Sequence, residues 1–357
     1  MLWLACRHHA GEIVLAHVWK FLLIEKSTSP QIDLFQRFKE HFKKYCNVKA
    51  NHFTVPKIDM SRKSKRDQIV ALCKDALQKG FDRGDYQELI ILTLVYLRSP
   101  PHEFKRLQTS GADSKARWMS KILFSIKIVL LPKQLEIFSK GEVIHPAQLG
   151  KIEVFVDFVV YCYVPWWITC SHTSSAPIND ITLLKSFMEY KSIHLGVATT
   201  ATRAFESHLW YLTEKLVPLS LFSNSIDEPC KEQLKDKMIT CRGTASSDIN
   251  SKRREHAFGK PIFPSVDNMQ KLEISNFVGV ESWRLFRILG LNTDFMSVSV
   301  CDWSSCESFL NAKNVINGLR VVNYQCRRKR RKTLPGLHRS VEIRRKNAKY
   351  SSGGRKF

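Results

Sequence analysis

The chain opens with Met1-Leu-Trp-Leu-Ala-Cys-Arg-His-His9, a short apolar run that is followed at once by the spacing Cys6-x-x-His9. The run from Leu2 to Ala5 is apolar enough to be a buried strand or the start of a buried helix. No capping residue or polar entry segment comes before it. Because a domain seldom begins within its own core, we expect the chain to be the carboxyl-terminal part of a longer protein.

Beyond this opening, apolar residues recur at helical spacing along most of the chain, and Gly or Pro residues separate several of the segments. Helices are predicted over residues 13–23, 34–42, 66–79, 85–98, 116–131, 152–162, 179–191, 198–216 and 305–319. Strand signals are few and lie at Leu2 to Ala5 and Met296 to Val300. The predicted fold class is therefore mainly α, with a helical body.

Composition divides the chain into four predicted parts. Residues 1–222 form the helical body, residues 223–264 a polar linker, residues 265–323 a small carboxyl-terminal helical unit, and residues 324–357 a disordered basic tail. The linker is predicted because Asn, Asp, Ser, Gly, Pro and Lys dominate between Ser223 and Pro264.

Positive charge is concentrated at the end of the chain. Lys and Arg outnumber Asp and Glu by 56 to 33, which gives a formal net charge of +23. Residues 327–357 contain 13 basic residues and one acidic residue, so this short stretch carries about half of the net charge. Six consecutive basic residues in it attract phosphates and are typical of a nuclear-localisation signal, namely Arg327, Arg328, Lys329, Arg330, Arg331 and Lys332. A solvated tail without an assigned partner is an equal alternative.

The cysteines and the apolar runs indicate the compartment. The ten cysteines are irregularly spaced in a chain without a recognisable secretory leader, so reduced thiols in the nucleus or the cytosol are expected. The apolar run from Phe158 to Thr169 is shorter than the roughly 20 residues that span a bilayer. No membrane partner is therefore predicted.

Cys6 and His9 are candidate metal ligands, but zinc needs three or four ligands and no second pair stands at ligand spacing. A nucleophile made of Cys6 and His8 has no identifiable third group to orient it. These arguments favour a buried cysteine beside a hydrogen-bonded histidine, and neither a metal nor a catalytic residue is assigned. Three more residues can complete a metal site only if the fold brings them close: Cys162, Cys170 and His172.

Arg117 and Trp118 lie where a helix is predicted to begin after the turn Ser110-Gly111-Ala112. On the residues alone, Trp118 anchors this helix in the core and Arg117 binds nearby backbone. Phosphoryl transfer on nucleic acid needs about three acidic ligands around its metal ions. Five acidic residues are available for that role, none in a context that marks a ligand: Asp157, Glu206, Asp294, Asp302 and Glu307.

Taken together, Cys6-x-x-His9 and the later Ala116-Arg117-Trp118 resemble the second half of a hAT-type transposase, whose interrupted RNase H-like domain has a C-x-x-H and an R-W motif. Longer stretches around both motifs, and residues 311–323, resemble a group of uncharacterised invertebrate proteins that derive from such elements. The resemblance runs from Met1 to about Asn323. It implies that the helical body includes a remnant of an RNase H-like α/β sheet.

Departures from the family pattern imply a catalytically incomplete protein. In such transposases two catalytic aspartates precede the C-x-x-H motif, whereas only five residues stand before Cys6 here. A third acidic residue belongs to a carboxyl-terminal helix, yet after Asn323 this sequence becomes basic, which suggests a shift of reading frame at that point. A divalent metal is expected only if the missing aspartates are restored.

Three functions remain open at this point. The favoured one is a transposable-element-derived, nuclear protein that binds DNA or RNA weakly and non-specifically through its basic tail. The second is a helical interaction module, nuclear or cytoplasmic, that docks a partner or a second copy through aromatic faces such as Phe35, Phe38 and Phe42. The third is a fragment of an active metal-dependent transposase or nuclease.

Overall fold

The computed structural model describes residues 6–23, 59–102, 117–131, 146–170, 172–244 and 271–319, together with residues 4, 34, 35, 38, 39, 53, 55 and 104. Within these ranges the fold is mainly α, as predicted, and no residue of them belongs to a β-strand. The strand signal at Leu2 to Ala5 lies outside the described residues except for Leu4, which belongs to neither a helix nor a strand.

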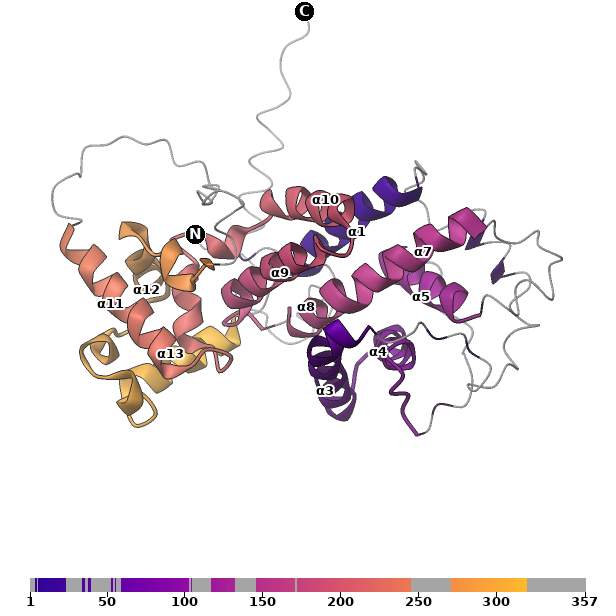
Figure 1. Ribbon diagram of the computed structural model, residues 1–357. Coiled ribbons are helices and arrows are strands. Elements are labelled where there is room, and N and C mark those ends of the chain that lie inside the picture. The colour runs from indigo at the N-terminus through magenta and orange to yellow at the C-terminus, as the bar shows by residue number, and fades with distance from the viewer. Residues whose placement is uncertain are drawn as a thin grey trace, which may run out of the picture.

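The longer helices are α1 (Arg7–Leu23), α3 (Lys63–Lys79), α4 (Gly84–Tyr96), α5 (Arg117–Leu130), α7 (Pro146–Phe158), α9 (Ala176–Tyr190), α10 (Leu195–Glu206), α11 (Glu228–Thr244) and α13 (Glu307–Gly318). Shorter pieces are α8 (Val164–Thr169), α12 (Arg284–Leu289), the π-helical segment η3 (Val159–Tyr163), and the 3-10 turns η2 (Met60–Arg62), η4 (Trp210–Leu212), η5 (Val217–Phe222), η7 (Ile274–Phe277), η8 (Val280–Trp283), η9 (Asp294–Ser297) and η10 (Val300–Asp302). In Figure 1, α1 to α10 form one group and α11 to α13 a second group beside it.

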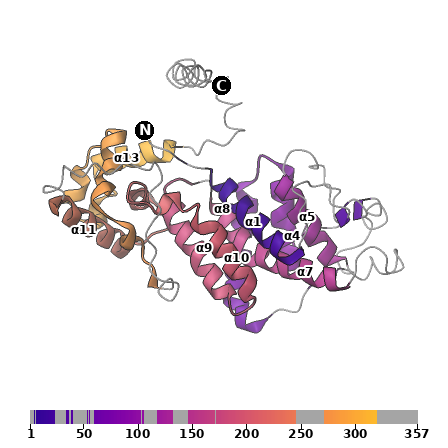
Figure 2. The same ribbon diagram turned by 90° about the horizontal axis from the view of Figure 1, so that it is seen from above.

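Helix α1 belongs to the larger group, side by side with α10 and in contact with α7 and α5 (Figure 1 and Figure 2). One face of α1 packs against these helices, while His9, His17, Lys20 and Phe21 are exposed. Side chains along its length are almost fully buried: Ala10, Val14, Leu15, Val18 and Trp19. The helix predicted from residue 13 therefore begins earlier, at Arg7, and contributes to the centre of the core.

The long helical stretch from Pro146 to Thr169 continues through Pro165, beyond the end predicted near Cys162. Proline has no N–H to donate, and one π-helical turn absorbs the defect: the Val164 N–H bonds the Val159 carbonyl five residues back. By length and composition this 24-residue stretch is the one candidate membrane span in the described chain, and 67% of its most apolar window is buried within the protein. Such burial is typical of a core helix.

Aromatic rings hold the second group together. The Phe222 and Phe309 rings stack with centroids 5.4 Å apart, and Trp303 lies 4.7 Å from Phe309. The Trp303 indole N–H donates to the Phe295 carbonyl at 2.8 Å, which satisfies its polar atom inside the cluster. Phe222 is the last residue of η5 and of the predicted helical body, and it packs against Phe309 of the predicted carboxyl-terminal unit. The two parts therefore share one continuous core.

Helix α11 shows that the linker prediction was wrong for residues 228–244. The helix begins after Asp227, whose carboxylate accepts a hydrogen bond from the Cys230 N–H at 3.0 Å. Leu234 and Met238, one turn apart, are fully buried, while most of their neighbours are polar. The sequence did not reveal this helix because its buried apolar stripe is narrow and most of its residues are polar. Of the rest of the predicted linker, residues 223–227 are described and include the buried Ser223 and Ile226, whereas residues 245–264 lie outside the described part of the chain.

The strand predicted at Met296 to Val300 was also wrong. The 3-10 turns η9 and η10 occupy this stretch, and they bury Phe295, Met296 and Val300 without any strand pairing. Alternation of buried and exposed residues over five positions is too short a signal to separate a strand from two successive turns.

The aromatic docking face predicted around residue 38 belongs to the core instead. Phe35 and Phe38 are 1% and 0% exposed, and both rings contact Phe124 in α5. Phe35 also lies against Trp19 of α1, with ring centroids 5.6 Å apart. Phe42, the third residue of the predicted face, lies outside the described residues.

Candidate functional site

The predicted motif Cys6-x-x-His9 lies at the beginning of α1. The His9 side chain is 63% exposed, and its Nδ1 is 3.9 Å from a carboxylate oxygen of Glu12. Cys6 is half-buried just before the helix. Across the ranges given above, no group of three His, Cys, Asp or Glu side chains is placed to hold a metal ion. Cys170, which the sequence offered as a further ligand, is buried, and its burial raises the pKa of the thiol to about 12.

His8, the residue before His9, is largely buried in the protein interior. Its ring centroid lies 6.1 Å from that of Trp167. Burial, together with the positive charges of Arg7 and Arg83, lowers the pKa of His8 to about 4. His8 is therefore a neutral side chain at pH 7.

Between Cys6 and His9, Arg7 enters the core and makes a buried ion pair. Its Nη2 lies 2.6 Å from the Asp180 Oδ1, and the Trp166 indole N–H donates to the same oxygen at 3.1 Å. The guanidinium carbon lies 5.1 Å from the Trp166 ring centroid and 5.9 Å from that of Tyr211. Burial raises the pKa of the Asp180 carboxyl, and Arg7 opposes that rise. The pair connects α1 to α9 and is a structural contact within the core.

The second predicted motif, Arg117-Trp118, begins α5 near the other end of α1. Trp118 is half-buried, and the Lys121 ammonium lies 4.3 Å from its ring centroid and 5.7 Å from that of Trp19. Because Trp19 follows His9 by ten residues, about 15 Å along the helix axis separates the two motifs. The structure therefore does not bring the two predicted motifs together. The Arg117 side chain and residues 327–332 lie outside the description.

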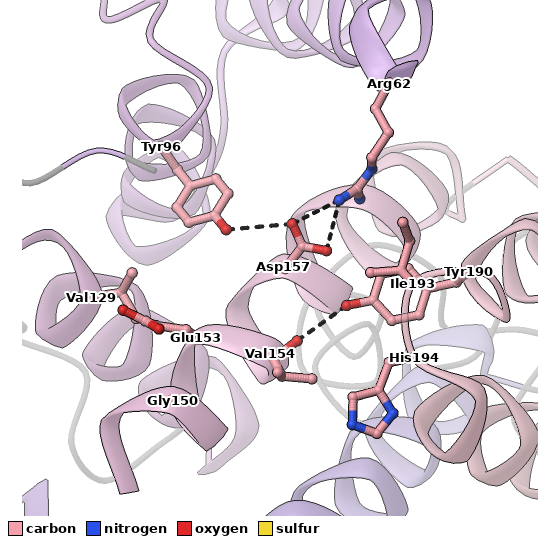
Figure 3. A pocket seen from close by; sticks show the side chains of 10 residues that line it. All are labelled: Arg62, Tyr96, Val129, Gly150, Glu153, Val154, Asp157, Tyr190, Ile193 and His194. Carbon is pink, nitrogen blue, oxygen red and sulfur yellow. Dashed lines mark hydrogen bonds and ion pairs between the residues drawn. The ribbon is translucent and has the colours of Figure 1, made fainter. Parts of the chain in front are cut away.

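A cavity of about 380 Å³ opens beside α7, and it is the candidate site that the fold itself creates (Figure 3). Its walls come from η2, α4, α5, α7 and α9 and from the turn before α10. The lining residues are Arg62, Tyr96, Val129, Gly150, Glu153, Val154, Asp157, Tyr190, Ile193 and His194.

Asp157 organises the polar end of the cavity. The Nη1 of Arg62 lies 3.0 Å from each of its carboxylate oxygens, and the Tyr96 hydroxyl approaches Oδ1 at 3.5 Å. The same guanidinium lies on the Tyr161 ring, 3.4 Å from the centroid, which holds it in place. These contacts fix η2, α4 and α7 relative to one another, and they neutralise the charge of Asp157 (Figure 3).

The remaining polar groups of the cavity are less fully engaged. Burial, and then the charge of Asp157, raise the pKa of both the Tyr96 and the Tyr190 hydroxyl, so both are neutral phenols. The Tyr190 hydroxyl donates to the Val154 carbonyl at 3.3 Å. Glu153, one helical turn before Asp157, is exposed and forms no ion pair with any described residue.

Of these lining residues, the sequence had singled out Asp157 alone, as one carboxylate among five. Asp157 and Glu153 are the two acids in the otherwise apolar stretch from Ile152 to Tyr163. The partners that give the cavity its character stand far away in the chain, 95 residues in the case of Arg62 and 61 in the case of Tyr96. A single sequence provides no means of pairing them.

Comparisons of the chain with protein-family models, with curated proteins and with solved structures give no match. Fold and cavity thus define a class by architecture: a mainly helical protein with one shared core and an ionic, tyrosine-lined cavity between its helices.

Proposed function

We propose that this chain is a transposable-element-derived protein that binds nucleic acid weakly and without sequence specificity. The observation that carries the proposal is the concentration of 13 basic residues and one acidic residue in residues 327–357. Such a stretch gains affinity by releasing counterions from phosphates, which needs no particular base sequence. The same six consecutive basic residues support a nuclear location.

The hAT-like ancestry within this proposal is supported by the order of the C-x-x-H and R-W motifs in the sequence. The proposal includes a remnant of an RNase H-like sheet within the helical body. It assigns the chain a binding role, and it names no catalytic residue and no cofactor.

Binding of fluorescent duplexes, followed by anisotropy, tests this proposal. We expect two duplexes of unrelated sequence to bind with equal affinity. Replacing Arg327, Arg328 and Lys329 by Gln should weaken both complexes. A matched variant replaces three exposed lysines of α3 by Gln and should leave both affinities unchanged: Lys63, Lys74 and Lys79.

Two outcomes of this experiment contradict the proposal. Full affinity in the tail variant would show that the basic stretch does not make the contacts. A strong preference for one duplex would show base readout, which a run of phosphate contacts cannot provide.

A second candidate function, an interaction module that pairs two copies of the chain, is favoured by an apolar surface at the junction of α1 and α10. Phe21, Ile193 and Leu195 are 46%, 47% and 65% exposed. The Phe21 ring lies against Gly196 and 6.1 Å from the His194 ring, so the three side chains are close in space. Light scattering in high salt tests it: a dimer that Phe21→Ser dissociates supports this function, and a monomer at all concentrations contradicts it.

A further inference from the structure

The cavity at Asp157 has the chemistry of a ligand site that is separate from any contact with nucleic acid. We infer that it binds a small organic cation with an apolar end, of the alkylammonium or arylalkylammonium kind. The inference rests on the charges, the hydroxyl groups and the walls of the cavity, and it does not depend on the proposed function.

The charges in the cavity favour a cation. Among the described residues that line the cavity, Arg62 is the only Lys or Arg, and its guanidinium contacts Asp157 and the ring of Tyr161. Glu153 lies one turn from Asp157 on the same face of α7 and has no ion-pair partner among the described residues. The Nδ1 of His194 accepts the Val197 N–H at 3.2 Å, so this nitrogen is already engaged within the protein. The charges of Arg62 and Asp157 cancel, so the negative charge of Glu153 remains.

A buried hydroxyl group points to the same ligand class. Tyr96 is only 7% exposed, and its hydroxyl is directed into the cavity (Figure 3). Its contact with Asp157, at 3.5 Å, is longer than an ordinary O–H···O hydrogen bond, which leaves the oxygen weakly engaged. An ammonium group has N–H donors for this oxygen and a charge for Glu153, so it satisfies both at once.

The apolar walls determine the rest of the ligand. Val129, Val154 and Ile193 line the cavity beside the polar end. Gly150 leaves its floor open, since a Cβ placed there meets nothing within 4 Å. The volume of about 380 Å³ lies within the range of small-molecule sites, roughly 300–1,000 Å³. A short alkyl chain or a single ring fills such a space.

Calorimetric titration of the full chain with benzylamine tests the inference, with benzyl alcohol and benzoate as neutral and anionic probes of similar size. We expect saturable binding of benzylamine at millimolar concentration and none of the other two probes. Glu153→Gln should weaken the binding about tenfold, as the loss of one partly exposed ion pair. Asp236→Asn, at an exposed carboxylate of α11, should leave it unchanged.

A second variant separates binding from folding. Gly150→Leu fills the floor of the cavity and should abolish benzylamine binding, while the melting temperature stays at or above that of the unmodified chain. The absence of saturable benzylamine binding, a preference for benzoate, or undiminished binding in both variants would overturn the inference.

The ammonium group can belong to a free amine or to a lysine side chain of another protein. Displacement of benzylamine by Nα-acetyl-lysine amide, whose ε-ammonium is free, with higher affinity than benzylamine itself, identifies a lysine side chain as the natural occupant. Weaker displacement identifies a free amine. Both results support an ammonium ligand.

Discussion

Arg7, at the start of α1, and Asp180, in α9, form an ion pair of 2.6 Å although 173 residues separate them in the chain. Both side chains are only 2% exposed. The Nε and Nη1 of Arg7 have no hydrogen-bond partner among the described residues. Asp180 and the rings of Trp166 and Tyr211 therefore offset most of the cost of burying its charge. Each charge is therefore tolerated only while the other is present.

Removing one partner of this pair should be costly. Asp180→Ala leaves a buried guanidinium without a counter-charge, and we expect the free energy of unfolding to fall by about 3–5 kcal/mol in urea denaturation. The double variant Arg7→Met with Asp180→Leu removes both charges and should be more stable than Asp180→Ala. As a control, Asp75→Ala breaks the exposed pair with Lys79 and should cost less than about 1 kcal/mol. A double variant less stable than Asp180→Ala contradicts this account.

His8 predicts a loss of stability in acid. Its pKa is about 4 in the folded protein, against 6.5 for an unperturbed histidine, so the unfolded chain takes up the proton first as the pH falls. Its contribution is complete above pH 6.5 and is lost as the pH falls toward 4, at up to about 1.4 kcal/mol per pH unit. Urea denaturation across this window should show a shallower decline for His8→Gln.

Two helical glycines should respond to alanine in opposite ways. A Cβ at Gly11 of α1 would lie 2.4 Å from the buried Trp166 ring, so Gly11→Ala should cost about 1–3 kcal/mol through overpacking. A Cβ at Gly150 of α7 meets nothing within 4 Å, and Gly150→Ala should stabilise the protein by about 0.5–1 kcal/mol through helix propensity. Thermal denaturation measures both. Stabilisation by Gly11→Ala would show that α1 and α8 are not packed at this distance.

Helix α11 should behave as part of the core. Leu234→Ala removes a fully buried side chain and should lower the free energy of unfolding by about 2–5 kcal/mol. Ile239→Ala on the same helix truncates a side chain that is 44% exposed, and its cost should be at most about 1 kcal/mol. Equal and small losses of stability in both variants would contradict this packing and support the prediction that residues 228–244 are a linker.

Much of the helical fold follows from local signals in the sequence. The helix predicted over residues 66–79 is observed as Lys63–Lys79 and ends before Gly80, which has a φ of +74°, as the breaker indicated. The end predicted at Cys162 failed because a π-helical turn carries the chain through Pro165, a compensation that depends on the surrounding core. Local patterns predict the ends of regular helices well. They do not predict a π-helical turn that continues a helix past a proline, because such a turn depends on the packing of the core.

The candidate site could not be predicted in the same way. Arg62, Tyr96, Asp157 and Tyr190 stand on four separate elements, and only the packing of α4, α7 and α9 around η2 brings them together. Likewise, nothing local distinguishes the buried Phe35 and Phe38 from an exposed aromatic face, because helical spacing shows that residues share a face but not what covers it. Long-range pairing is the information that a single sequence lacks.

The salt dependence of DNA binding tests the central claim, non-specific binding through the basic stretch, most directly. Anisotropy titrations of a duplex at increasing KCl should give a linear fall of log Kobs with log salt, with a slope of about −0.9 per phosphate contact. Changing all six residues from Arg327 to Lys332 to Gln should make this slope shallower by about 0.9 for each phosphate contact that is lost, and it should weaken binding at low salt. A slope that the six substitutions leave unchanged would contradict the claim, because the counterions would then be released by contacts elsewhere in the protein.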